Sequence, residues 1–155
     1  MAAGGTVHLQ VTGRGGVPAS GVAAVVLNVT VKAPTKPGYV RLYGEGATEP
    51  GTLNLNYVAA KTVQNLVVAP VGAFGMVNLY NNSNGTVQLI ADVSGYFRSG
   101  APIAAGAFGS LAPSRLLDTR SGVVVPRVRC RRAAPCICRS REVAVSLLLA
   151  CRRWC

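Results

Sequence analysis

Two carboxylate residues, Glu45 and Glu49, lie four positions apart in the segment GEGATEPG. A carboxylate pair is the chemistry of glycoside hydrolysis, in which one group acts as general acid and the other as base or nucleophile, and it also suits calcium. Neither function is expected here, because no supporting aspartate lies in the segment and its glycines and proline predict an exposed loop. The two glutamates are therefore interpreted as solvated side chains.

Few other residues are able to do acid–base or metal chemistry. His8 is the only histidine, and a zinc or catalytic role would need partners that the cysteine-free part of the chain does not supply. We expect His8 to be a solvated surface residue. Asp92 and Asp118 are expected to cap turns or to pair with Arg115 or Arg120. The sequence thus predicts no enzyme, no catalytic residue, no cofactor and no metal site.

Asparagine and tyrosine side chains form the most suggestive set for ligand binding. Amides hydrogen-bond to hydroxyl groups such as those of sugars, and an exposed aromatic ring offers a flat face for stacking. The alternative interpretation, which the sequence pattern favours, is that the asparagines fill turns and outward strand positions while the tyrosines face the core. Under the first interpretation, the predicted glycan-binding residues are Tyr43, Asn54, Asn56, Tyr80 and Asn82.

These residues fall within short segments that alternate apolar and polar side chains. The segment Val22–Val31 is rich in valine and predicts a central strand, and the Asn-Gly pair in Asn81–Gly85 predicts the tightest hairpin turn. No segment has convincing helical periodicity. The pattern is typical of an all-β antiparallel β-sandwich of about eight strands, with a closed barrel as the alternative. The other predicted strands are Thr6–Thr12, Tyr39–Tyr43, Leu53–Tyr57, Thr62–Pro70, Met76–Tyr80, Thr86–Val93 and Ser114–Arg120.

The predicted sandwich unit covers residues 4–98 and is followed by a linker at residues 99–107. Residues 108–122 are interpreted as the opening strand of the next repeat. The linker is long enough to cross a small domain, and loop-closure entropy grows only slowly with length. We therefore expect Leu116 and Leu117 to fold back onto the same sandwich, with one of them inward.

Charge and cysteine are concentrated near the C-terminal end. The chain has a net charge of +11, but residues 1–122 hold eight basic and four acidic side chains and no cysteine. Residues 123–155 hold eight arginines, one glutamate and all five cysteines. Arginines on such a segment attract phosphate non-specifically. The CICR segment lacks the paired cysteine spacing of a zinc site. The apolar segment Leu147–Ala150 is too short to span a bilayer. We expect no specific nucleic-acid partner and no membrane span.

The segment Ala133–Cys155 matches Gly4–Val26 in a different reading frame. Read one base out of phase, codons for this segment encode GGTVHLQVTG, then GGVPASGV and AVV, which are the residues of Gly4–Val26 at all but two places. The matching positions lie 128 residues apart, as Val26 and Trp154 do. We interpret residues 123–155 as a frameshifted copy of a tandem repeat and expect them to be disordered.

The segments GTVHLQVTGRGG, VAAVVLNVTV, LNLNYVAAKTVQNLVV, VNLYNNSNGTVQLIADVSGYF and SRLLDTRSG together resemble a tandem β-repeat domain of secreted and cell-surface actinobacterial proteins. The resemblance covers nearly all of residues 4–122. It implies repeat units that open with an RLLDTR-type strand and close with an IADVSGYF-type strand, in an extracellular or cell-surface protein. Met1 is followed directly by AAGGTVHLQ, without a signal peptide. The chain is accordingly expected to be a truncated fragment that begins inside a unit.

These observations predict a non-enzymatic extracellular repeat module that acts as a spacer or as an adhesion or display unit in a larger protein. The expected partners are neighbouring repeats or an appended domain. The alternative is a carbohydrate-binding module for cell wall or exopolysaccharide, with glycans as partners. A glycosidase that uses Glu45 and Glu49 is the third alternative.

Overall fold

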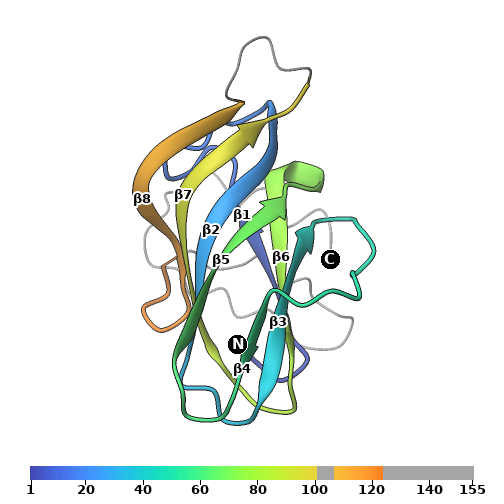
Figure 1. Ribbon diagram of the computed structural model, residues 1–155, viewed down its shortest axis with the longest axis vertical. Helices are drawn as coiled ribbons and strands as arrows, with labels where there is room; N and C mark the ends of the chain where they lie inside the picture. Colours follow the sequence, from blue (N-terminus) through green and yellow to red (C-terminus); the bar gives the residue numbers. More distant parts are fainter. Residues whose placement is uncertain (101–106, 124–155) are drawn as a thin grey trace, which may run out of the picture.

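The computed structural model describes residues 1–100 and 107–123 of the chain. They form two four-stranded antiparallel sheets that pack face to face, as the sequence predicts (Figure 1). The first sheet has the order β1-β6-β3-β4, with β1 at Thr6–Gln10, β6 at Met76–Asn82, β3 at Gly38–Gly44 and β4 at Leu55–Tyr57. The second sheet has the order β5-β2-β7-β8, with β5 at Val63–Pro70, β2 at Val22–Lys32, β7 at Gln88–Arg98 and β8 at Phe108–Asp118.

Strand β2 is central in the second sheet, where it pairs with both β5 and β7. Leu27, Val29 and Val31 point inward and are fully buried, whereas Asn28 and Thr30 between them face outward. This period of two follows from the pleat of a strand, which sends successive side chains to opposite faces. The prediction of a central strand at this segment is confirmed.

The core lies between the two sheets and is built almost entirely of valine and leucine. Both sheets contribute fully buried side chains, and Tyr57 on β4 adds a tyrosine that is only 4% exposed. Burying one valine or leucine side chain stabilises the fold by roughly 1.5–3 kcal/mol relative to leaving it exposed. The largest fully buried side chains are Leu9, Leu27, Leu79, Leu89 and Leu117.

Several predicted strand bounds differ from the observed ones. The strand predicted at Leu53–Tyr57 begins only at Leu55, and Leu53 lies before β4 and is 45% exposed. Strand β1 ends at Gln10 rather than Thr12, because the N–H groups of Val11 and Thr12 donate to the carbonyl oxygen of Gly75 instead of to a strand ladder. Local alternation continues past the point where a pairing partner is lost, so it does not mark the end of a strand.

The segment Asn81–Gly85 is not a hairpin turn, and that prediction is wrong. Strand β6 before it belongs to the first sheet and β7 after it belongs to the second, so the segment crosses between layers. The buried side chain of Asn81 holds the crossover: its amide nitrogen donates to the carbonyl oxygens of Ala2 and Gly85 at 2.9 and 3.0 Å. A Cβ atom at Gly85 would lie 2.6 Å from Oγ1 of Thr35, so glycine is needed here for close approach.

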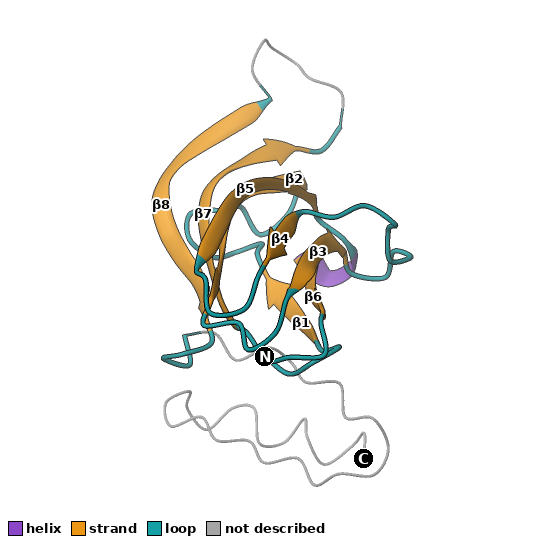
Figure 2. Cartoon of the chain, turned by 60° about the horizontal axis from the view of Figure 1, so that its bottom comes forward, coloured by secondary structure: helices purple, strands orange, loops and turns teal. Residues whose placement is uncertain are grey.

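Strand β8 folds back onto the same sandwich and forms the edge of the second sheet beside β7 (Figure 2). The predicted fold-back of this segment is confirmed, although Leu116 and Leu117 are both buried rather than one alone. A register shift opposite Ala91 and Asp92 is the reason, because the irregular pairing lets two successive side chains turn inward. Of the predicted frameshifted tail at residues 123–155, all but Val123 lies outside the described residues.

Candidate ligand-binding face

The outer surface of the first sheet carries a group of polar and aromatic side chains, here called the polar face. Val and Leu residues take most of the inward positions of β1, β3 and β6, which leaves the alternate positions outward. Asn56 is the exposed residue of β4. The polar face comprises Thr6, His8, Gln10, Tyr39, Arg41, Tyr43, Asn56, Met76, Asn78, Tyr80 and Asn82.

Strand register arranges these side chains in rows that run across the sheet. Successive rows on one face are two residues apart along each strand, which is about 7 Å, and neighbouring strands are about 4.8 Å apart. Adjacent members of one row are therefore within reach of one another and of a single ligand. The rows are Asn82, Tyr39 and Asn56; Thr6, Tyr80 and Arg41; and His8, Asn78 and Tyr43.

Four of the five residues predicted for glycan binding lie on this face. Tyr43 and Tyr80 come from the neighbouring strands β3 and β6, and Asn56 and Asn82 lie in one row. Asn54 does not join them. Its Oδ1 accepts a hydrogen bond from the backbone N–H of Leu42 at 2.6 Å, so its side chain ties the start of β4 to β3.

The favoured interpretation expected the tyrosines to face the core, but not all of them do. Tyr57 does, but Tyr39, Tyr43 and Tyr80 are only partly buried and point outward. The prediction is wrong for these three because Val40 and the other aliphatic residues of their strands already occupy the inward positions. Burial raises the pKa of Tyr43, and the nearby Glu49 carboxylate raises it further, so its hydroxyl remains protonated as a hydrogen-bond donor.

His8 has a partner, contrary to the expectation of a solvated histidine. Its Nδ1 lies 2.5 Å from Oε2 of Glu45, and both side chains are about four-fifths buried. The two residues are 37 positions apart and come together only because β1 and β3 flank β6 on opposite sides. Nothing in the local sequence around either residue signals this pair.

Glu49 is also paired rather than simply solvated. Its carboxylate accepts a hydrogen bond from Nη1 of Arg41. Nη2 of the same guanidinium donates to the hydroxyl of Tyr39 at 3.1 Å, and the guanidinium carbon lies 4.9 Å from the centre of that ring. Each of the two glutamates is thus bound to a different basic side chain, and the pair is not arranged as two free carboxylates.

Asn78 is the residue of the polar face with the most unusual surroundings. It is only 4% exposed, and its Oδ1 is buried without a hydrogen-bond partner among the described residues. It lies between His8 and Tyr43 in their row. A buried polar atom without a partner is destabilising by roughly 1–3 kcal/mol. Such an atom points to a water molecule or ligand group that completes its hydrogen bonding.

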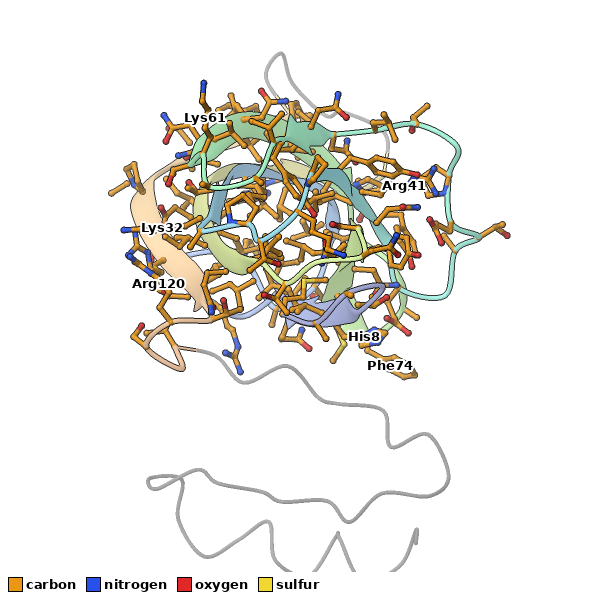
Figure 3. All side chains as sticks on the ribbon, turned by 90° about the horizontal axis from the view of Figure 1, so that it is seen from below. His8, Lys32, Arg41, Lys61, Phe74 and Arg120 are labelled. Atoms are coloured by element: carbon orange, nitrogen blue, oxygen red, sulfur yellow. The ribbon has the colours of Figure 1, made fainter. Side chains whose placement is uncertain are left out.

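A short turn at the end of the face carries a strained and exposed aromatic residue. The 3-10 turn η1 spans Ala73–Gly75, and within it Phe74 has φ 58° and ψ 16°. Its side chain is 85% exposed and projects from the same side of the sandwich as His8 (Figure 3). The turn is attached to the face, because Nε2 of Gln10 donates to the carbonyl oxygen of Phe74 at 3.0 Å.

The remaining acidic residues lie on the second sheet and serve its edge strand. The expectation that Asp92 and Asp118 pair with arginines is confirmed: Asp92 pairs with Arg115, and Asp118 pairs with Arg115 and Arg120. Hydrogen bonds from Arg120 hold the pKa of Asp118 well below its ordinary value. Within the described residues, no three His, Cys, Asp or Glu side chains gather as a metal site requires.

Comparison of the chain with protein-family models, curated proteins and solved structures finds no match. The tandem-repeat resemblance of the sequence therefore stays a prediction. Residues 1–100 and 107–123 contain no apolar helix long enough to cross a membrane. The function has to be argued from the polar face itself.

Proposed function

We propose that this domain is a non-enzymatic adhesion module that binds neutral polysaccharide through its polar face. The observation that carries the proposal is the gathering of tyrosine rings and amide groups from neighbouring strands on one sheet surface. In the described part of the chain, no hydrogen bond engages the side-chain amides of Asn56 or Asn82, and both side chains are at least partly exposed. These two amides are therefore available to a ligand.

The chemistry of the face suits sugar rings. Each amide both donates and accepts hydrogen bonds, as each sugar hydroxyl does, and the tyrosine rings offer apolar surface for stacking. Rows about 7 Å apart repeat this chemistry along the sheet, which suits an extended chain better than a compact molecule. The guanidinium of Arg41 is already bound to Glu49, so the face offers acidic sugars no unpaired cation on that strand.

The second candidate is a spacer or display unit of a larger extracellular protein, without a ligand of its own. The 128-residue spacing between Gly4–Val26 and its out-of-frame copy favours it, because tandem arrays extend a protein without needing a binding site. The two candidates differ in one measurable respect. A spacer tolerates changes on the polar face without functional loss, whereas an adhesion module does not.

The test is affinity electrophoresis of the full chain, under reducing conditions, in gels that contain hydroxyethylcellulose, laminarin, mannan or anionic alginate. Tyr80→Ala removes a ring from the centre of the face, and Leu66→Ala is the matched control because Leu66 is 62% exposed on β5 of the other sheet. We expect retardation by at least one neutral polysaccharide. Tyr80→Ala is expected to weaken it about tenfold, which corresponds to about 1.4 kcal/mol.

The outcomes separate the candidates. Retardation that is lost with Tyr80→Ala and kept with Leu66→Ala supports binding through the polar face. Retardation by alginate alone that vanishes at high salt reflects the arginine-rich C-terminal segment and counts against the proposal. Absence of retardation by every neutral polysaccharide leaves the spacer as the function.

A further inference from the structure

Phe74 combines a left-handed backbone conformation with an exposed aromatic ring. Its backbone is in the left-handed region at φ 58°, which L-residues other than glycine, asparagine and aspartate seldom adopt. Its side chain is 85% exposed, so burial of the ring does not offset the strain. Glycine would fit the turn without strain, which leaves the benefit of the ring outside the folding of the domain.

The turn is held rigidly in place, so the ring has a defined position. The backbone N–H of Ala73 donates to the carbonyl oxygen of Glu45 at 2.8 Å, and that of Gly75 donates to the carbonyl oxygen of Gly72 at 3.2 Å. Nε2 of Gln10 adds a bond to the carbonyl oxygen of Phe74 from the polar face. An exposed ring on a fixed backbone is suited to binding a ligand with little loss of conformational entropy.

His8 and Asn78 lie near this turn, and each has a side-chain atom to which no described residue hydrogen-bonds. The Glu45 carboxylate is an acceptor, so Nδ1 of His8 donates in their hydrogen bond, and no described residue bonds to Nε2 of the same ring. In the next position of the same row, Oδ1 of Asn78 is an acceptor without a partner. A sugar hydroxyl both donates and accepts hydrogen bonds, so it is matched to the Nε2 atom of His8 and to the Oδ1 acceptor of Asn78.

We propose that Phe74, His8 and Asn78 form a terminal subsite of the polar face that takes one neutral sugar ring. Phe74 stacks on the apolar face of the ring, and hydroxyls at the ring's edge hydrogen-bond to Nε2 of His8 and, after a small movement of the side chains that cover it, to the buried Oδ1 of Asn78. The subsite rests on the proposed function and extends it past the end of the sheet. It also identifies the residues that determine how the end of a glycan chain is held.

The test measures binding and stability on the same variants of the full chain. Phe74→Gly removes the ring and relaxes the backbone, Phe74→Ala removes the ring alone, and Phe74→Tyr keeps a ring. Phe108→Ala is the matched control, because Phe108 is 44% exposed and lies on β8 of the opposite sheet. The probe is whichever neutral polysaccharide retards the wild-type chain among hydroxyethylcellulose, laminarin and mannan, and thermal unfolding is followed by circular dichroism.

We expect Phe74→Gly and Phe74→Ala to weaken binding about three- to tenfold, the scale of one lost stacking contact, while Phe74→Tyr and Phe108→Ala bind as the wild type does. The thermal midpoint of Phe74→Gly is expected to equal or exceed that of the wild type, because strain is relieved. A lower midpoint would show that the ring supports the fold and would overturn the subsite. Unchanged binding by Phe74→Ala, with binding lost in Tyr80→Ala, would overturn the subsite alone, whereas no binding by the wild type would overturn the proposed function with it.

Discussion

The guanidinium of Arg115 on β8 donates two hydrogen bonds to the carboxylate of Asp92 on β7, from Nε to Oδ1 at 2.7 Å and from Nη2 to Oδ2 at 3.2 Å. This bidentate contact fixes the register of the edge strand β8 next to the point where its pairing with β7 is irregular. The contact is solvent-exposed on the arginine side and adds modestly to stability by itself. The buried leucines that follow it contribute far more to docking the strand.

Leu116→Asp combined with Leu117→Asp should destabilise the domain by about 3–5 kcal/mol, because both side chains are buried and the new carboxylates would lack partners. Urea unfolding of the full chain measures the change. Ala112→Asp is the matched control, since Ala112 is exposed on the same strand and its substitution should alter stability by less than about 0.5 kcal/mol. Equal stability of the double variant and the wild type would show that β8 is not docked in solution.

Asp118 should make the stability of the domain depend on acid pH. Its folded-state pKa is depressed, chiefly by hydrogen bonds from Arg120, so the stabilisation is fully present above the ordinary value of 3.8 and is lost as the pH falls below it. Chemical unfolding at pH 6 and pH 3 measures the loss. Asp118→Asn should be less stable at pH 6 and should lose less than the wild type on acidification. An identical acid response in both proteins would contradict this assignment.

Gly72→Ala should destabilise the domain by about 1–3 kcal/mol or more, because a Cβ atom there would clash with the backbone of Glu45 and Gly44. The clash involves backbone on both sides and cannot be relieved by a rotamer change. Gly51→Ala is the control, since no heavy atom lies within 4 Å of a Cβ at that position. Thermal unfolding compares the two variants, and equal midpoints would argue against the close contact between η1 and the loop that carries Glu45.

Tyr57→Phe should destabilise the domain by about 1–3 kcal/mol, the cost of leaving a buried acceptor without its partner. The hydroxyl of Tyr57 donates to Oδ1 of Asn81, whose amide nitrogen holds the crossover between the sheets. Urea unfolding measures the loss, with Tyr80→Phe as the control because Tyr80 lies outside the core. A Tyr57→Phe variant as stable as the wild type would mean that water replaces the hydroxyl.

Alternation along single strands was enough to predict the all-β sandwich and the central position of Val22–Val31. The pleat forces successive side chains onto opposite faces, so a buried strand must show this pattern in its sequence. The docking of Leu116 and Leu117 was predicted from the length of the linker instead, and the expectation that only one of them faces inward was wrong because both are buried. Local reasoning also failed at Asn81–Gly85, because an Asn-Gly pair signals a turn without stating which sheet the next strand joins.

The polar face was decided by strand order, which no local pattern contains. Sequence chemistry selected Tyr43, Tyr80 and two of the asparagines, but only the pairing of β3 and β6 brings the tyrosines together. The contact between His8 and Glu45 requires β1 and β3 to flank β6, and these strands meet across dozens of intervening residues. Residue types thus determine which groups are available, whereas long-range pairing of backbone hydrogen bonds determines which of them become neighbours.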